Sequence, residues 1–259
     1  MDPIVAMEGV TYSYPTRKTV EHPSLLQDFS IRITPQEIVA MVGPSACGKS
    51  TIARLIAGLL FPKAGKVLFN GQPVRQPSRE RGLIAQGDWC LPWFTVRKNI
   101  HLGLAKPLQD GQLDHLLRVA GLAGSLDKYP AELSFGARQR VCLVRALVAG
   151  ADVLLLDEPL SSVDAVRKLS LEQSIRATLK AANVSALWIT HDLDEALLVA
   201  DRLIVVGKRP LGILYEEEVL RTSEQVQLTI STPEFQKRRL ALHNRVAALW
   251  PSEGGMLDQ

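Results

Sequence analysis

The sequence predicts an α/β fold with a mainly parallel sheet, because strand-like and helix-like segments alternate along a chain of 259 residues. Short apolar runs of strand length lie at residues 38–43, 67–70, 82–86, 153–158, 186–191 and 203–207. Segments with helical periodicity lie between most of them, at residues 49–59, 138–148, 166–182 and 194–200. Strands joined through helices pair in parallel and are covered by helices on both faces, so we expect one large core.

Two parts of the chain depart from this alternation. Residues 4–14 and 26–33 are strand-like and have no helix between them, which predicts a small antiparallel sheet near the N-terminus. Residues 87–132 are richer in helical patterns, with Leu113, Leu116 and Leu117 along one face. We therefore expect a helical insertion at about residues 87–150.

The C-terminal region changes character after Pro210. Pro233 is placed to start a helix. Its apolar stripe consists of Phe235, Leu242, Val246 and Leu249. The predicted organisation is one domain over residues 1–232, followed by a C-terminal helix and polar tail over residues 233–259. The chain has no internal repeat.

Charge gives little support for a nucleic-acid partner. The formal net charge is only +3, whereas a phosphate-binding footprint needs Lys and Arg clustered on one face. The nearest cluster is Lys237, Arg238 and Arg239, for which a solvated helix face is favoured over a binding patch. We expect no nucleic acid to bind.

The cysteine pattern and hydropathy indicate the compartment. Cys47, Cys90 and Cys142 are widely spaced and odd in number, which favours free thiols in a reducing compartment. No leader pattern opens the sequence, and no window approaches the ~20 apolar residues of a membrane span. Any association with a membrane is therefore expected to run through a partner.

Residues 43–51 read GPSACGKST and fit the phosphate-binding pattern G-x-x-x-x-G-K-[ST]. A predicted strand precedes the pattern and a predicted helix follows it, which disfavours the alternative of a plain glycine-rich turn. Lys49 is expected to reach the β- and γ-phosphates, and the Ser50 hydroxyl to ligate Mg²⁺. The predicted nucleotide-binding residues are Gly43, Pro44, Ser45, Ala46, Cys47, Gly48, Lys49, Ser50 and Thr51.

Residues 153–159, VLLLDEP, predict a buried strand that ends in two adjacent carboxylates. Alternation along a strand is expected to send Asp157 and Glu158 in opposite directions, so that the two carboxylates serve different roles. Asp157 is predicted to hold Mg²⁺ through its water shell, and Glu158 to polarise the attacking water as a general base. The alternative is a strand end with two solvated acids.

Further motifs follow in a fixed order. They are Tyr14 before the glycine-rich loop, Gln86 after a strand, LSFGA at residues 133–137, SSVD at residues 161–164, and His191 at a strand end. With the two motifs above, they resemble an ATP-binding cassette (ABC) ATPase, and the resemblance covers about four fifths of the chain. The resemblance implies a P-loop NTPase core with ATP and Mg²⁺ as cofactors.

The resemblance also implies a role for each residue. Two cassettes face each other head to tail, and Ser134 and the N–H of Gly136 bind the γ-phosphate of the ATP held by the opposite subunit. Tyr14 stacks on the adenine ring. The catalytic residues are Glu158, His191, Lys49 and Gln86, and the metal residues are Ser50, Gln86 and Asp157.

The signature departs from the family pattern at two positions. Phe135 stands where glycine is usual, and Ala137 stands where glutamine is usual. The motif at residues 161–164 departs more mildly, at Ser162 and Val163. The site this chain offers in cis looks competent, whereas the contact it makes in trans is altered. We therefore expect pairing with a second ABC ATPase, a different subunit with an intact signature.

Residues 81–86, 91–96 and 99–100 resemble the importer group that handles nitrate, taurine, other sulfonates and bicarbonate. The Leu-Pro-Trp run after Gln86 is the most recognisable feature, although Ala85 stands where phenylalanine is common. The alternative for residues 91–96 is an apolar loop packed on the helical insertion. Trp93 and Phe94 are expected to line a groove for a short helix of a transmembrane permease subunit.

The resemblance predicts a transport ATPase that powers uptake of a small anion from the cytoplasmic face of the inner (plasma) membrane. Its partners would be a transmembrane permease, a second ABC ATPase and, indirectly, a periplasmic substrate-binding protein. The alternative is an ATP-gated regulatory or catalytically weak subunit of a heterodimeric pair. A soluble ABC ATPase of DNA repair or translation is disfavoured, because those proteins usually carry long coiled-coil insertions or two cassettes.

Overall fold

The computed structural model describes residues 2–15, 24–87, 90–104, 111–161, 163, 165–207, 210–219 and 232–250. The strands are β1 (Val5–Tyr12), β2 (Leu26–Ile33), β3 (Ile38–Val42), β4 (Ala64–Phe69), β5 (Gln72–Pro73), β6 (Arg81–Ile84), β7 (Val153–Asp157), β8 (Ser185–Thr190), β9 (Arg202–Val206) and β10 (Ile213–Glu218). The helices are α1 (Lys49–Ala57), α2 (Val96–His101), α3 (Gln112–Val119), α4 (Phe135–Val148), α5 (Ala165–Ala181), α6 (Leu193–Val199) and α7 (Pro233–Leu249). Two 3-10 turns lie at Ala123–Ser125 and Pro130–Glu132.

The larger sheet has six strands in the order β10-β9-β3-β8-β7-β6. All neighbouring strands pair in parallel except β10, which runs antiparallel to β9 at one edge. The prediction of a mainly parallel sheet is confirmed. The edge strand β10 escaped prediction, because its sequence, ILYEEE, is mostly polar and exposed.

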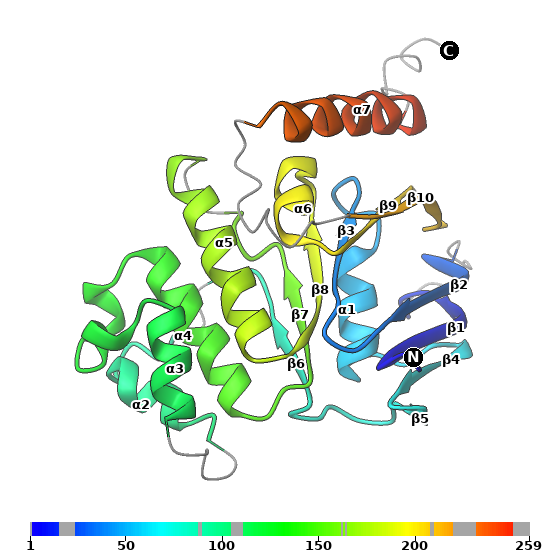
Figure 1. The fold of residues 1–259 in the computed structure, drawn as a ribbon. Coiled ribbons are helices and arrows are strands. Elements are labelled where there is room, and N and C mark those ends of the chain that lie inside the picture. The colour runs from blue at the N-terminus through cyan, green and yellow to red at the C-terminus, as the bar shows by residue number, and fades with distance from the viewer. Residues whose placement is uncertain are drawn as a thin grey trace.

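Alternation along the central strand β3 distributes its side chains between two cores. Val39 and Met41 pack with α1 and the small sheet, whereas Ile38 and Ala40 pack with the helices of the opposite face. Figure 1 shows α1 on one side of the sheet and α4, α5 and α6 on the other. Because both faces are covered, every residue of β3 is buried.

The smaller sheet is antiparallel, in the order β2-β1-β4-β5, as expected for the opening segments. The apolar run at residues 67–70 is part of β4 and belongs to this sheet, not to the parallel one. A short local turn follows the run, so a helix does not separate β4 from β5. The smaller sheet packs beside α1, as the ribbon shows (Figure 1).

The expected helical segment contains α2, α3, both 3-10 turns and α4, which gather on one side of the molecule (Figure 1). The C-terminal helix α7 lies next to α6 and buries Phe235, Leu242 and Val246 in the main core, whereas Leu249 is only partly buried. The apolar stripe predicted on this helix is therefore largely confirmed. The domain division at residues 232 and 233 stays a prediction.

Ion pairs hold the amino ends of the parallel strands. The Arg202 Nε lies 2.6 Å from the Glu37 Oε1, just before β3. Asp201 is paired with Arg176 and Lys180 of α5 at 2.7 Å each. These five residues form what we call the amino-end clamp, which lies at the end of the sheet opposite the glycine-rich loop.

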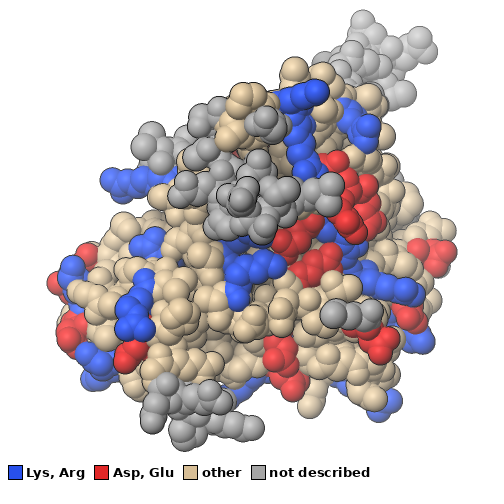
Figure 2. Space-filling model, viewed as in Figure 1, with Lys and Arg blue, Asp and Glu red and all other residues tan. Residues whose placement is uncertain are grey.

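Figure 2 shows acidic and basic side chains interspersed over the described part of one face. In the basic cluster of α7, the Arg239 Nε lies 2.6 Å from Asp194 Oδ1, and the Arg238 Nη2 lies 3.5 Å from Glu217 Oε1. Two of its three cations are thus paired with acids, as on a solvated helix face. Among the described helices, none has the length and apolar content needed to cross a bilayer. The three cysteines are free thiols, as expected.

Candidate nucleotide site

The glycine-rich loop joins the carboxyl end of β3 to the first turn of α1. A Cβ on Gly43 would lie 2.5 Å from the Val206 Cγ2, so only glycine fits the close approach to β9. Gly48 has φ 122°, a conformation that glycine adopts readily. Gly48 is also the N-cap of α1 and no side chain makes a capping bond there, so the helix N-terminus offers its N–H groups to an anion.

Lys49 lies across this loop. Its ammonium donates to the carbonyl oxygens of Gly43 at 2.7 Å and Pro44 at 2.8 Å, and the residue is 4% exposed. A buried ammonium needs hydrogen-bond partners, and the two carbonyl oxygens hold it at the mouth of the loop. This geometry suits a point charge that contacts phosphate oxygens.

Ser50 and Asp157 come together from α1 and β7. The Ser50 hydroxyl donates to the Asp157 Oδ1 at 2.9 Å. Burial raises the pKa of the Asp157 carboxyl, and the bond from Ser50 partly offsets the rise. Nearby positive charge would favour its ionised form.

A hydroxyl and one carboxylate are a partial set of ligands for Mg²⁺, which usually keeps several waters and binds one or two carboxylates plus phosphate oxygens. In the described part of the chain, no three His, Cys, Asp or Glu side chains cluster as a metal site of their own. The Ser50–Asp157 pair therefore fits a cation that arrives with phosphate.

Glu158 does not follow strand alternation. β7 ends at Asp157, and Glu158 has φ 48°, so the chain turns and both carboxylates border the same pocket. The expectation that the two would point in opposite directions is wrong, because the strand ends one residue earlier than predicted. The Glu158 Oε1 lies 3.5 Å from the Nδ1 of His191, which follows β8.

These groups border one open pocket of about 460 Å³. Its lining residues are Tyr14, Leu25, Ser45, Ala46, Gly48, Lys49, Ser50, Thr51, Gln86, Asp157 and Glu158. The Tyr14 hydroxyl lies 3.0 Å from the Thr51 Oγ1, and its ring meets Tyr12 edge to face. The Gln86 amide donates to the Ser161 hydroxyl at 3.1 Å.

The signature residues lie in a second place. Ser134 is the N-cap of α4 and accepts from the Ala137 N–H at 3.3 Å. The helix begins at Phe135, earlier than the predicted residues 137 or 138, because this serine cap starts it. Gly136 therefore lies in the first turn, where a Cβ would meet the Leu171 Cδ2 at 2.9 Å.

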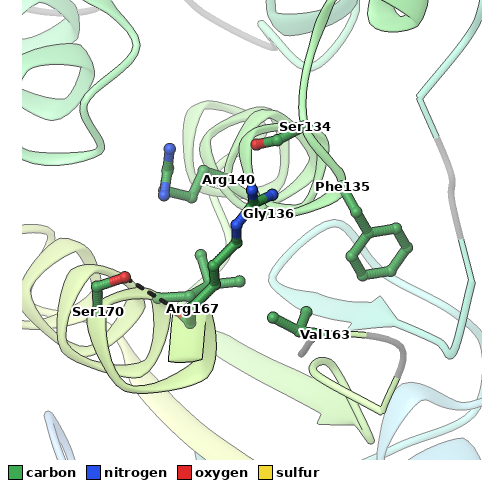
Figure 3. A pocket seen from close by; sticks show the side chains of 8 residues that line it. Ser134, Phe135, Gly136, Arg140, Val163, Arg167 and Ser170 are labelled. Carbon is green, nitrogen blue, oxygen red and sulfur yellow. Dashed lines mark hydrogen bonds between the residues drawn. The ribbon is translucent and has the colours of Figure 1, made fainter. Parts of the chain in front are cut away.

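Figure 3 shows the cavity of about 180 Å³ beside this helix start. Arg167 of α5 points toward Gly136, whereas the Phe135 ring turns away to the other side (Figure 3). The Phe135 ring stacks with Arg138, whose guanidinium carbon is 5.8 Å from the ring centroid. The bulk of Phe135 therefore lies beside the helix start, and its ring does not cover Gly136.

One pocket thus collects most of the predicted cis residues, and His191 reaches it through Glu158. Gly43, Pro44 and Cys47 of the loop are not among its lining residues. Ser134 and Gly136 border the other cavity, so a single chain does not bring the two sets together. Ser162 and Asp164 of the motif at residues 161–164 lie outside the described residues. Ser161 accepts from Gln86, and Val163 lines the signature cavity.

Leu25 and Arg167 are among the lining residues that sequence reasoning missed. Leu25 packs against Gly48 and borders the nucleotide pocket, although no motif marks it. Arg167 borders the signature cavity. Its signal was its position, since an arginine three residues after Asp164 falls in the first turn of the next helix.

The fold and these motif residues define an ABC ATPase cassette. A family model described as ABC transporter matches residues 26–161, and the chain belongs to that family. It is 35% identical over 235 residues to the taurine import ATP-binding protein TauB of Roseobacter denitrificans, which covers 87% of this chain and 88% of that protein. It is 35% identical over 229 residues to the nitrate import ATP-binding protein NrtC of Synechococcus elongatus, covering 85% of this chain.

The chain spans only 35% of the length of that nitrate relative and 36% of a bicarbonate transport ATP-binding protein, CmpC, of the same species. Among solved structures, cbiO1 from Clostridium perfringens, part of the ABC transporter complex cbiONQ, matches with a TM-score of 0.72 and covers 96% of this chain and 99% of that one. The dimeric cassette MJ0796 bound to ADP and Pi matches with a TM-score of 0.67, covering 84% and 100%. Both are 23% identical and support the fold.

Proposed function

We propose that this chain is the ATP-hydrolysing subunit of an importer and powers uptake of a small anion such as nitrate, a sulfonate or bicarbonate. The observation that carries the proposal is the single pocket that combines Lys49, the Ser50–Asp157 pair and Glu158. Relatives whose names specify nitrate, taurine and bicarbonate transport support the class of solute.

In the proposed mechanism, the loop N–H groups and Lys49 bind the β- and γ-phosphates. Ser50 and Asp157, with Gln86, would hold Mg²⁺, which would neutralise phosphate charge there. Glu158 accepts the proton of the attacking water, and His191 keeps this carboxylate aligned, which their 3.5 Å separation supports. Tyr14 supports the adenine ring from the rim of the pocket.

The second half of the proposed site comes from another cassette. Ser134 and the N–H of Gly136 would face the γ-phosphate of a partner's ATP, because an α-helix N-terminus favours an anion. Their separation from the cis pocket in one chain supports action in trans. The Phe135 and Ala137 substitutions favour a different subunit as the partner, with its own signature intact.

The proposed membrane partner is a permease, which would hold this chain at the cytoplasmic face of the inner membrane. Trp93 is 66% exposed and its ring lies 6.3 Å from that of Phe94. An exposed tryptophan beside a half-buried phenylalanine suits a helix of the permease, since aromatic anchors commonly bind an apolar helix face. A periplasmic binding protein would act through that permease.

A regulatory subunit is the second candidate function. The altered signature supports it, because a reshaped trans contact would let this chain set the rate at which the partner hydrolyses its ATP. In that case this chain would gate a partner ATPase.

The test of catalysis is Glu158→Gln in the assembled transporter. Removing the general base should lower kcat for ATP about 10²- to 10⁴-fold and leave ATP binding intact. Lys49→Ala is the control for binding, and it should weaken ATP affinity itself. Unchanged hydrolysis in the Glu158→Gln variant would indicate that ATP is hydrolysed at the partner's site, and would favour the regulatory candidate.

The test of assembly is purification of the tagged chain from detergent-solubilised membranes, with every co-purifying polypeptide identified. A multi-spanning permease and a second ATPase in equal amount are the expected products. Recovery of the chain alone would contradict the transporter proposal.

A further inference from the structure

An ion-pair cluster joins α5 to the start of α6, the helix that follows His191 in the chain. The Lys168 ammonium lies 2.6 Å from the Asp192 Oδ2 and 2.8 Å from the Glu195 Oε2. The Lys168 side chain is 20% exposed and that of Glu195 only 4%. One cation of α5 thus balances two carboxylates at the N-terminus of α6.

Asp192 fixes the turn that carries His191. Its Oδ1 accepts from the N–H groups of Asp194 at 2.9 Å and Glu195 at 3.2 Å, which makes it the N-cap of α6. Its own N–H donates to the Thr190 hydroxyl at 3.0 Å, at the end of β8. Since the His191 side chain is 57% exposed, packing does little to orient it, and the turn sets its direction.

Glu195 belongs to the same cluster and also contacts β8. Its Oε1 accepts from the Trp188 indole N–H at 2.5 Å, and its Oε2 pairs with Lys168. A nearly buried carboxylate is costly without an opposite charge. Loss of the Lys168 charge would therefore leave two acids side by side and displace the start of α6.

We propose that Lys168 is a positioning residue that holds the His191 turn so that the imidazole stays aligned with Glu158. The inference rests on the proposed ATPase function and assigns a residue that no motif contains. Lys168 lies in the first half of α5, and its ion pairs tie that helix to the histidine turn.

The test is the ATPase activity of Lys168→Met and Lys168→Arg in the assembled complex. Lys168→Met should lower kcat about 10- to 100-fold, because a small displacement of a catalytic group has this cost. The KM for ATP should stay within about twofold, because the phosphate-binding loop is not touched. Lys168→Arg, which retains the charge, should recover most of kcat.

Lys180→Met is the matched control. Lys180 lies on the same helix and pairs with Asp201 at 2.7 Å, but belongs to the amino-end clamp, far from the site along the strands. It should leave kcat near the wild-type value while removing a comparable ion pair. Equal kcat losses in the Lys168→Met and Lys180→Met variants would overturn the proposal in favour of a purely structural role.

A double-mutant cycle with His191→Ala gives the decisive readout. If Lys168 acts through His191, Lys168→Met should add no loss in the His191→Ala background, whereas independent effects would multiply and overturn the proposal. Should Lys168→Met fail to fold, Asp192→Asn carries the same cycle, because it retains the capping oxygen and removes the charge. An inactive wild-type complex would refute the proposed function itself; an active complex with a silent Lys168→Met refutes only this inference.

Discussion

Tyr14 is held at the pocket through two parts of its side chain, the hydroxyl and the ring. Its hydroxyl lies 3.0 Å from the Thr51 Oγ1 of α1, and the residue is 44% exposed at the rim of the pocket. The edge of the ring meets Tyr12 at a centroid distance of 5.1 Å. The ring face is therefore held in place and accessible to a base.

Tyr14→Ala should weaken ATP binding about 5- to 150-fold, since base–aromatic stacking contributes ~1–3 kcal/mol. Tyr14→Phe should bind ATP nearly as tightly as the wild type, because the stacking face remains. Calorimetric titration with ATP measures both variants. Equal losses in the two would assign the effect to the hydroxyl and contradict stacking.

Glu172 is a buried acid whose stability effect depends on pH. It is 2% exposed, and burial, with the negative charge of Glu195, raises its pKa to about 7. Its ordinary pKa is near 4.5, so the folded state binds the proton more tightly than the unfolded state. The stabilisation from this proton is present below pH 4.5 and is lost as the pH rises to about 7.

Glu172→Gln should therefore raise the free energy of unfolding at pH 8 by up to about 3 kcal/mol. At pH 4.5 the variant and the wild type should be nearly equal, because both side chains are then neutral. Urea unfolding at the two pH values measures the difference. A gain of the same size at both would show that the effect is not one of ionisation.

At the scale of elements, α4 carries the departure from the family signature. Ser134 caps the helix and Gly136 leaves its first turn close to Leu171, so the helix N-terminus is intact. The Phe135 ring lies beside the helix start, under the Arg138 guanidinium. What the helix lacks is the amide at residue 137 and the small residue at 135.

The double substitution Phe135→Gly and Ala137→Gln should raise the ATPase rate of the chain when it pairs with itself. The physical reason is closer approach to a phosphate and one more hydrogen-bond donor across the interface. ATP affinity in cis should change less than twofold, because the nucleotide pocket is separate. Steady-state hydrolysis at high protein concentration measures the rate, and an unchanged rate would contradict the heterodimer proposal.

The elements that sequence predicted well are those whose apolar periodicity is strong. β3, β7 and β8 are wholly buried, so their apolar runs stand out. The exposed β10 and the two-residue β5 give no such signal. They are strands because they pair with β9 and β4, which their own sequences do not reveal.

Within the site, the sequence supplied the residues and the structure supplied their relations. The spacing in residues 43–51 predicted a loop between a strand and a helix, and that arrangement is found. The turn at Glu158 was not predictable, because its left-handed conformation depends on how the loop after β7 packs. The contribution of Leu25 likewise arises from contact between distant segments.

At the scale of the whole molecule, exposed apolar side chains mark where partners could bind. Trp93→Ser should reduce recovery of the permease in co-purification, because it removes an exposed aromatic anchor. ATP binding by the isolated chain should be unchanged. Leu240→Ser on α7 is the control, since Leu240 is 63% exposed and lies far along the chain from residue 93. Equal loss of permease in both variants would contradict a specific groove at Trp93.

The amino-end clamp gives the molecule a mechanical asymmetry. Arg176 and Lys180 fasten the C-terminal half of α5 to the floor of the sheet, whereas Arg167 and Lys168 at its other end meet the signature cavity and the histidine turn. The C-terminal half of α5 is thus fixed to the amino ends of the strands. If α5 tilted about this fixed half, its N-terminal end would move furthest. The histidine turn and the signature cavity, which both contact that end, would then be displaced together.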